Sequence, residues 1–294
     1  MAKNIIFQIH SDDVINFFKS GNIRIEFNSK ANVTKKLCII YFSSNEIYYP
    51  NTSSAFSYSI IDRDRYEWTK YKFNGAFKHI FVRDIRKQWY VGGINSIIDT
   101  TEKLLEFLKC ETKGFMVYTL GSSAGGYASI LFGSLLYANR IYAFNPQLNL
   151  FKTISQSNYF RDPLLFNYKD DSLYNKYYDL SPFIIQSTNI FYFQSYQSKQ
   201  DIDQYNSISP EAKANLNTIR FQTSNHGFPF LRINIHNVLS FEKDELINMK
   251  NKIFHPFLFS IHLVGIFETI QFIFKAIFLR FKKKLIEFQN YYFN

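Results

Sequence analysis

The amino-acid sequence predicts an α/β fold with a mainly parallel sheet, and three observations support this. Short apolar runs alternate with segments of helical periodicity along most of the chain. The chain has 294 residues, 46% of them hydrophobic, which is enough to build one large core. No internal repeat and no Gly/Ser-rich or Pro-rich linker divides it. Because a connection between two parallel strands crosses over in the right-handed sense, helices should flank the sheet.

The expected elements follow one another in a regular order. Strands are expected at the apolar runs 4–9, 23–27, 36–42, 79–83, 114–120, 140–144, 189–195 and 217–222. Residues 94–109 place apolar side chains on one helical face, and further helices are expected at about 124–137 and 209–216. The rhythm breaks at about 146–188, where aromatic and polar residues show no clean period. Long segments of this kind are often lids or binding loops, so we expect an irregular cap there.

Composition limits the classes of protein that this chain can belong to. The two cysteines, Cys38 and Cys110, argue against a disulfide framework and favour a reducing, cytoplasmic setting. The N-terminal apolar run is short and is followed at once by Asp12 and Asp13, so we expect no signal peptide. No CxxC, no HExxH and no histidine pair at ligand spacing is present, so we expect neither a metal site nor nucleic-acid binding.

The last part of the chain, residues 251–294, differs from the rest. It holds six Lys/Arg and two Asp/Glu and so supplies +4 of the net charge of +10. Its apolar stretch 256–279 is long enough to cross a membrane, but Glu268 and Lys275 lie within it and would be costly there. Four basic residues follow: Arg280, Lys282, Lys283 and Lys284. We therefore expect a catalytic domain at 1–250 and an amphipathic, basic helical tail that contacts either a membrane surface or another protein, including a second copy of this chain.

The motif with the clearest chemistry is G-x-S-x-G, formed by Gly121, Ser123 and Gly125. It follows a predicted strand and opens a predicted helix, as a nucleophile elbow requires. Such a turn exposes the serine above the carboxyl ends of the strands, where the N–H of Ala124 can bind a developing oxyanion. Ser122 is the adjacent alternative, but only Ser123 lies centrally between the glycines. The motif and its context predict an α/β-hydrolase fold with Ser123 as nucleophile.

The partners of this serine are expected later in the chain, because α/β-hydrolases follow the order Ser, acid, His. His226 follows the last predicted sheet strand, whereas His236 lies in an apolar helical run and is expected to pack. Asp201 and Asp203 both follow the preceding strand, and their spacing does not separate them as the triad acid. A second oxyanion donor is expected from a backbone N–H in the loop after an early strand, at Ser43 or Ser44.

At this point a family resemblance appears. The run GSSAGGYASILFGSLLYANRIYAFNPQ at 121–147 resembles α/β-hydrolase-fold proteins of bacterial capsule and exopolysaccharide synthesis, a group that includes capsular polysaccharide O-acetyltransferases. Upstream, FVRDIRKQWYVGG at 81–93 resembles the Asp…Trp-Tyr…Gly segment of the same group. The resemblance covers roughly residues 36–240. It implies acyl chemistry on a surface glycan, with acetyl-CoA as the acyl donor and no bound cofactor.

Carried over residue by residue, the resemblance implies that Ser123 is the nucleophile, His226 the base and Asp203 the acid. The group shows an aspartate followed three residues later by His or a similar polar residue. Here the third residue after Asp203 is Asn206, a departure that leaves Asp201 open as the alternative acid.

The expected function is serine-dependent O-acetyl transfer to a bacterial surface polysaccharide. In the cap, Tyr159, Tyr174 and Tyr177 are candidate sugar-contacting residues, although such rings can equally pack the cap onto the sheet. Two alternatives stay open: a carbohydrate or lipid esterase with the same triad, and an inactive scaffold in a glycan-assembly or secretion complex. The expected location is the cytoplasm, including the inner face of the membrane if the tail binds there.

Overall fold

The computed structural model describes residues 6–31, 36–187 and 189–292; in the last helix it describes side chains only to residue 278 and at Phe281. Within these residues one eight-stranded sheet has the order β1-β3-β2-β4-β5-β6-β7-β8. The strands are β1 (Ile23–Phe27), β2 (Leu37–Phe42), β3 (Lys78–Val82), β4 (Met116–Ser122), β5 (Arg140–Phe144), β6 (Ile190–Ser195), β7 (Asn217–Phe221) and β8 (Ile253–Phe254). Among these described strands, only the β1–β3 pair is antiparallel. The predicted α/β class with a mainly parallel sheet is confirmed.

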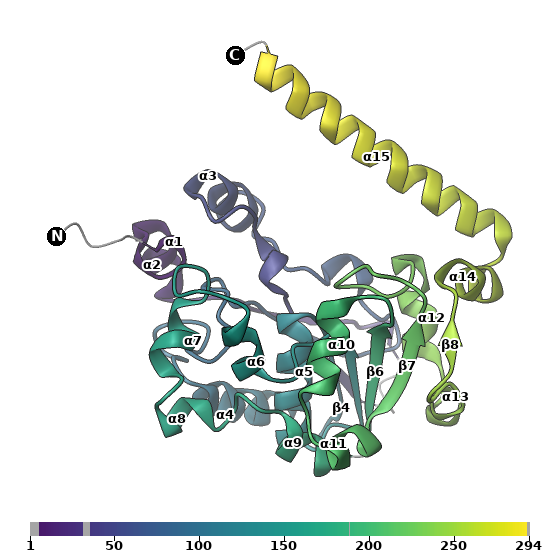
Figure 1. Cartoon of the computed structure of the whole chain (residues 1–294), viewed down its shortest axis with the longest axis horizontal. Helices are drawn as coiled ribbons and strands as arrows, with labels where there is room; N and C mark the ends of the chain where they lie inside the picture. Colours follow the sequence, from purple (N-terminus) through teal and green to yellow (C-terminus); the bar gives the residue numbers. More distant parts are fainter. Residues whose placement is uncertain (1–5, 32–35, 188, 293–294) are drawn as a thin grey trace.

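Both faces of the sheet are buried, which explains why its strands read as continuous apolar runs. Alternate residues of β2 point to opposite faces: Cys38 and Ile40 enter one hydrophobic cluster, and Ile39 and Tyr41 enter the other. Helices α4 (Thr101–Thr112), α5 (Ala124–Leu135), α9 (Ser181–Ile185) and α11 (Pro210–Asn215) contribute to the first cluster. Helices α12 (Ile235–Ser240), α13 (Lys243–Asn248) and α14 (Pro256–Val264) contribute to the second. Figure 1 shows the sheet between these layers.

Two elements differ from the sequence prediction. The described part of the run 4–9, expected as a strand, overlaps helix α1 (Phe7–His10), which is followed by α2 (Asp12–Phe18). Phe7 packs against the rings of Tyr48 and Phe56 in a separate small cluster, so its apolar character serves packing outside the sheet. The helix expected from 94 begins at Thr101, because the Thr100 hydroxyl caps it by accepting from the Lys103 N–H at 3.2 Å.

The expected cap at 146–188 consists of short helices joined by turns. They are α6 (Leu150–Ser155), α7 (Pro163–Tyr168), α8 (Ser172–Asn175) and α9. A further short helix, α3 (Ser53–Phe56), lies in the connection between β2 and β3. Helix α10 (Lys199–Asn206), which the sequence analysis did not identify, directly follows β6.

The expected boundary at residue 250 lies too early in the chain. Strand β8 pairs with β7, and Phe259 of α14 is only 4% exposed in the second cluster. Ser260 is fully buried, and its hydroxyl lies 3.3 Å from Asn234 Oδ1 and 3.0 Å from Thr269 Oγ1. The separate tail is therefore helix α15 (Ile266–Tyr292), which begins after Gly265.

Helix α15 leaves α14 and runs diagonally above the rest of the chain in the view of Figure 1. One of its faces is apolar and exposed, with Phe267, Phe274, Phe278 and Phe281 each more than half accessible. The side chains of the basic cluster Arg280 and Lys282–Lys284 lie outside the described residues. Within the described part of the chain, no helix combines the length and the apolar character needed to span a membrane.

Candidate active site

The turn between β4 and α5 has the geometry of a nucleophile elbow. Ser123 stands at this turn with φ 55°, a strained conformation for a residue other than glycine. The flanking glycines are required by close backbone contacts. A Cβ on Gly121 would lie 2.0 Å from the Gly125 carbonyl oxygen, and a Cβ on Gly125 would lie 2.2 Å from the Phe42 carbonyl oxygen. Strand and helix therefore approach each other as the G-x-S-x-G spacing predicts.

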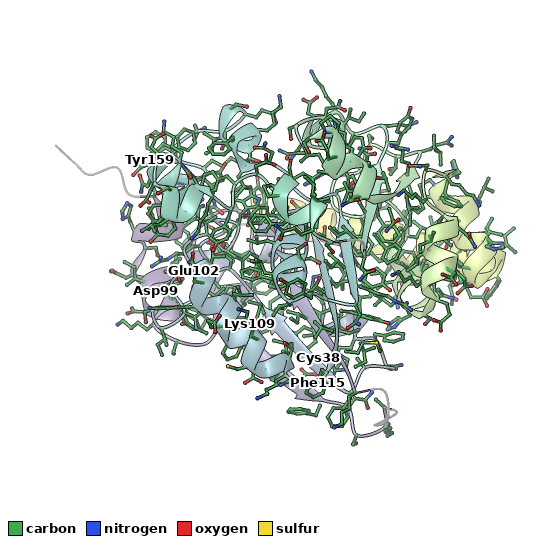
Figure 2. All side chains as sticks on the ribbon, turned by 90° about the horizontal axis from the view of Figure 1, so that it is seen from below. Cys38, Asp99, Glu102, Lys109, Phe115 and Tyr159 are labelled. Atoms are coloured by element: carbon green, nitrogen blue, oxygen red, sulfur yellow. The ribbon has the colours of Figure 1, made fainter. Side chains whose placement is uncertain are left out.

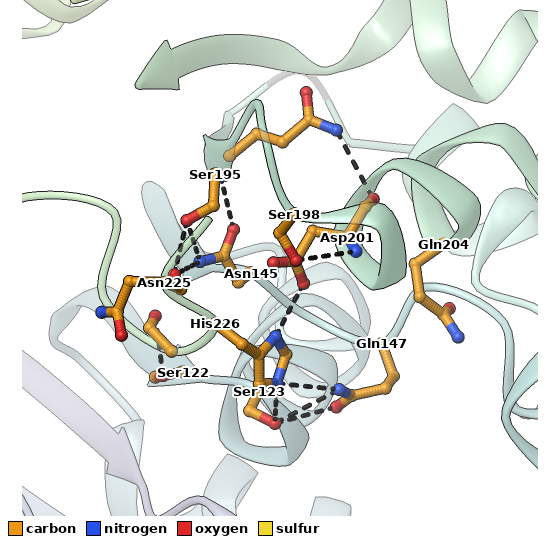
Figure 3. Close-up of polar contacts among 12 residues, drawn as sticks. Ser122, Ser123, Asn145, Gln147, Ser195, Ser198, Asp201, Gln204, Asn225 and His226 are labelled. Carbon is orange, nitrogen blue, oxygen red and sulfur yellow. Dashed lines mark hydrogen bonds and ion pairs between the residues drawn. The ribbon is translucent and has the colours of Figure 1, made fainter. Parts of the chain in front are cut away.

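His226 lies between Ser123 and a buried carboxylate (Figure 3). Its Nε2 is 3.0 Å from Ser123 Oγ, and its Nδ1 is 2.7 Å from Asp201 Oδ1. An ionised carboxylate only accepts hydrogen bonds, so Nδ1 carries the proton and Nε2 is free to accept one from the serine. The three side chains come from segments that follow β4, β6 and β7, whose carboxyl ends meet at one edge of the sheet.

The structure places Asp201, and not Asp203, against His226. Two residues apart on helix α10, their side chains point to nearly opposite faces of the helix. Asp201 is 1% exposed and faces the histidine, whereas Asp203 is half-buried and accepts a hydrogen bond from Gln156 Nε2 at 3.3 Å. The implied pairing of Asp203 with His226 is therefore wrong in this structure. The third residue after Asp201 is Gln204, so the resemblance also fits when its register is shifted by two residues.

The histidine loop is tied to the ends of the strands by a network of hydrogen bonds. Ser122 Oγ donates to the Gly227 carbonyl at 3.0 Å, so the residue next to the nucleophile holds the loop and does not face His226. Asn145 donates to Ser195 Oγ at 2.8 Å, and Ser195 Oγ donates to the Asn225 carbonyl at 2.7 Å. These bonds connect β4, β5 and β6 to the turn that carries His226 (Figure 3).

Of the expected oxyanion donors, only Ala124 is placed as predicted. It is the first residue of α5, where a backbone N–H has no acceptor within the helix. The Ser43 N–H donates to the Val82 carbonyl at 3.0 Å, as a continuation of the sheet. The Ser44 N–H donates to Glu67 Oε2 at 2.5 Å. These two N–H groups are occupied, so the structure does not support Ser43 or Ser44 as an oxyanion donor.

The three tyrosines expected to contact sugar do not line the site. Tyr174 stacks on Tyr168 with ring centroids 4.0 Å apart, and Tyr177 is 8% exposed with its hydroxyl 2.8 Å from Glu102 Oε1. Tyr159 lies at the outer rim of the molecule beside the N-terminal helices (Figure 2). These rings pack the cap together, which is the alternative that the sequence analysis left open.

A large cleft surrounds the serine and the histidine, with a volume of about 1590 Å³. Its aromatic lining includes Tyr49, Trp68, Tyr71, Trp89 and Phe228. Helix α15 forms part of its wall through Phe272, Ile273, Lys275, Ala276 and Ile277. Six basic side chains line it against four acidic ones: Arg65, Lys87, Arg161, Lys199, Arg232 and Lys275. Burial lowers the pKa of Lys87 to about 8.

Sequence reasoning missed one residue at the centre of the site, Gln147. Its carboxamide lies against Ser123 and His226, although it was visible as the last residue of the motif run 121–147. The signal that could have found it is its position, three residues after β5, at the same edge of the sheet as the elbow. Among the described side chains, no group of three or more His, Cys, Asp or Glu residues is placed to hold a metal ion.

Comparison with solved structures agrees with this architecture. The capsule O-acetyltransferase of Neisseria meningitidis serogroup A superposes with a TM-score of 0.50 and 16% identity, over 78% of this chain and 92% of that chain. A puromycin-hydrolyzing peptidase of Mycobacterium tuberculosis gives a TM-score of 0.49 and 10% identity, over 79% of this chain and 38% of that chain. Esterase B of Lactobacillus rhamnosis gives 0.47 and 11%, over 78% and 88%.

The chain has the α/β-hydrolase fold, which the meningococcal capsule O-acetyltransferase shares. The sequence matches no protein-family model and no curated protein sequence.

Proposed function

We propose that this protein is a serine-dependent acyltransferase that transfers an acetyl group to a hydroxyl of a bacterial surface polysaccharide. The observation that carries the proposal is the hydrogen-bond chain from Ser123 through His226 to Asp201, in a large cleft at the carboxyl ends of the strands. Nucleophile and base within hydrogen-bond reach, with the base oriented by a third group, define nucleophilic catalysis. An inactive scaffold would not require this arrangement.

The proposed reaction has two halves. Ser123 Oγ attacks the carbonyl carbon of the donor, and its proton passes to His226 Nε2. The tetrahedral intermediate collapses, the thiolate of the donor leaves with that proton, and an acetyl-enzyme remains. An acceptor hydroxyl then attacks the acetyl group and gives its proton to His226, and collapse returns the proton to Ser123 Oγ. Asp201 holds the imidazole in the required tautomer and stabilises its cation in both halves.

The cleft supports the proposed donor and acceptor classes. Its volume of about 1590 Å³ exceeds what a single drug-sized molecule needs, as expected for a site that takes a donor and a glycan. Its excess of basic side chains suits an anionic donor such as acetyl-CoA, whose phosphates favour arginine and lysine. A structure of the meningococcal capsule O-acetyltransferase holds CoA. The aromatic rings that line the cleft suit the apolar faces of sugars.

Labelling with a fluorophosphonate tests the nucleophile first. We expect one label on the parent protein, located at Ser123 by peptide mass spectrometry, and none on Ser123→Ala. Ser122→Ala is the matched control, because it removes the adjacent hydroxyl, and it should still be labelled. An unlabelled parent protein would support the inactive-scaffold alternative.

Incubation with acetyl-CoA and a panel of capsular glycans then separates the two enzyme classes. Acetylated glycan in the mass spectrum, with CoA release that depends on the glycan, is expected for the transferase. Release of acetate at the same rate with and without glycan would instead identify an esterase.

A further inference from the structure

The carboxamide of Gln147 lies directly against the reacting atoms of the site. Its Nε2 is 3.2 Å from Ser123 Oγ and 3.4 Å from His226 Nε2, and its Oε1 is 3.3 Å from Ser123 Oγ (Figure 3). Gln147 is 3% exposed, so this amide has lost its contact with bulk water. A buried amide next to the nucleophile needs a partner for its N–H groups, and the reacting oxygens are the nearest candidates.

Trp89 fixes the orientation of this amide. The indole Nε1–H lies 3.1 Å from Gln147 Oε1, and an indole N–H can only donate. The oxygen of the amide must therefore face Trp89, and the NH₂ group must face Ser123 and His226. Because Trp89 is 6% exposed, this hydrogen bond is sheltered from water and holds the donor in one direction.

The loop that carries Trp89 is built around one buried carboxylate, Asp84. Its two oxygens accept four backbone N–H groups, at 2.6 to 3.1 Å, from Arg86, Lys87, Gln88 and Tyr90. These bonds hold Trp89 at φ 53° and Tyr90 at φ 62°, conformations that are costly without such support. The sequence motif 81–93 thus has a structural explanation. Asp84 fixes the conformation of the loop, and the loop positions the Trp89 indole so that it donates to Gln147 Oε1.

We propose that the Gln147 side chain is the second oxyanion donor, and that Trp89 is the residue that positions it. The inference rests on the proposed acyl-transfer function. The loop N–H groups that usually supply this donor, those of Ser43 and Ser44, already donate to Val82 and Glu67. The Ala124 N–H, at the first position of α5, is the first donor in this proposal.

In the proposed step, Ser123 Oγ forms its bond to the acyl carbon and its proton moves to His226 Nε2. The C=O π bond breaks, and its electron pair moves to the oxygen, which becomes the oxyanion. The Gln147 N–H that faced the serine oxygen now donates to this oxyanion. When the C=O bond re-forms, the leaving group departs with the proton from His226. Because the charge exists only in the transition state and the intermediate, the donor should act on kcat and leave ground-state binding alone.

The test is Gln147→Met, which keeps the length of the side chain and removes both polar groups. With p-nitrophenyl acetate we expect kcat to fall about 10²- to 10³-fold, with KM changed less than about threefold. Affinity for a trifluoromethyl ketone, which forms a tetrahedral oxyanion adduct on the serine, should fall by the same factor as kcat/KM. Trp89→Phe should lower kcat about tenfold in the parent protein and add nothing to Gln147→Met.

Gln88→Met is the structural control, because Gln88 is a buried glutamine of the same loop whose side chain does not touch Ser123. The Gln88→Met variant should have a lower melting temperature. Its affinity for the trifluoromethyl ketone should not fall by more than any change in its KM for the substrate. A kcat within about threefold of the parent in Gln147→Met would overturn the inference, as would a loss of ketone affinity in Gln88→Met of the same size. A parent protein that is not labelled by fluorophosphonate would refute the proposed function itself, so the two failures are distinguishable.

Discussion

Replacing Asp201 by asparagine should nearly abolish activity, and the structure indicates by how much. Asp201 Oδ1 contacts His226 Nδ1 at 2.7 Å, while among the described residues its buried Oδ2 has no hydrogen-bond partner. If the new amide turns its NH₂ to Nδ1, the ring must carry its proton on Nε2 and can no longer accept from Ser123. That wrong tautomer alone costs about 10⁴-fold in kcat.

If the amide turns its oxygen to Nδ1, the tautomer survives but the carboxylate charge is lost. Unit charges about 4 Å apart attract by about 4 kcal/mol at an effective dielectric constant of about 20, which corresponds to about 10³-fold for the imidazolium formed in the reaction. The NH₂ would then occupy the partnerless Oδ2 position, at a cost of about 1–3 kcal/mol. Both orientations therefore predict a loss of about 10³- to 10⁴-fold.

The assay is kcat/KM for p-nitrophenyl acetate, with Asp203→Asn as the matched control on the same helix. Among the described hydrogen bonds, the Asp203 side chain has only the one from Gln156 at 3.3 Å, so we expect its variant to stay within about twofold of the parent. A larger loss in Asp203→Asn than in Asp201→Asn, or mild losses in both, would refute the reasoning.

Three further perturbations are expected to have distinct effects. Ser122→Ala removes the hydrogen bond, of about 1 kcal/mol, between the elbow and the Gly227 carbonyl. Turnover should fall about fivefold to tenfold, while fluorophosphonate labelling is retained. Unchanged turnover would show that the His226 loop keeps its position without this bond. Burial lowers the pKa of His79 from 6.5 to about 4, and its Nδ1 lies 3.2 Å from the Tyr41 hydroxyl. As pH falls from about 6.5 to about 4, the unfolded chain therefore binds a proton that the folded chain does not, and the free energy of unfolding should fall by about 3 kcal/mol. Urea titrations of His79→Gln should lack this part of the pH dependence, and an unchanged slope would contradict the assignment. Deleting residues 271–294, which leaves the anchor at Thr269, should keep small-ester turnover within about twofold and abolish salt-sensitive binding to anionic vesicles. If the full-length protein does not bind vesicles but forms a dimer, a second copy of the chain packs on the apolar face of α15.

The sheet and the elbow were predictable because their signals are local. Strands buried on both faces must be apolar throughout, and the elbow needs glycines at two positions where any Cβ would meet backbone. His226 could be placed because a turn after the last long strand must lie at the same edge as the elbow. The short strand β8 was not predicted, because an edge strand of two residues is too short to show a hydrophobic periodicity.

The choice between Asp201 and Asp203 required a helix that the sequence analysis did not identify. Once α10 is known to begin at Lys199 with Ser198 as its cap, helical geometry alone separates the two carboxylates. The role of Gln147 was hidden for a different reason. It depends on an indole that arrives from 58 residues away, and no local pattern encodes such a contact.

Because of helix α15, the access of molecules to the serine and the chemistry at the serine can change independently. The helix supplies part of the cleft wall but no member of the hydrogen-bond chain. It joins the sheet domain at Gly265, with φ 91°, and through the buried Thr269 hydroxyl, 3.0 Å from Ser260 Oγ. A lineage can therefore replace or extend this helix, and so alter which molecules reach the serine, while the loops that perform the chemistry stay constant. Among descendants of this chain, divergence should concentrate after residue 265 wherever the acceptor has changed and the reaction has not.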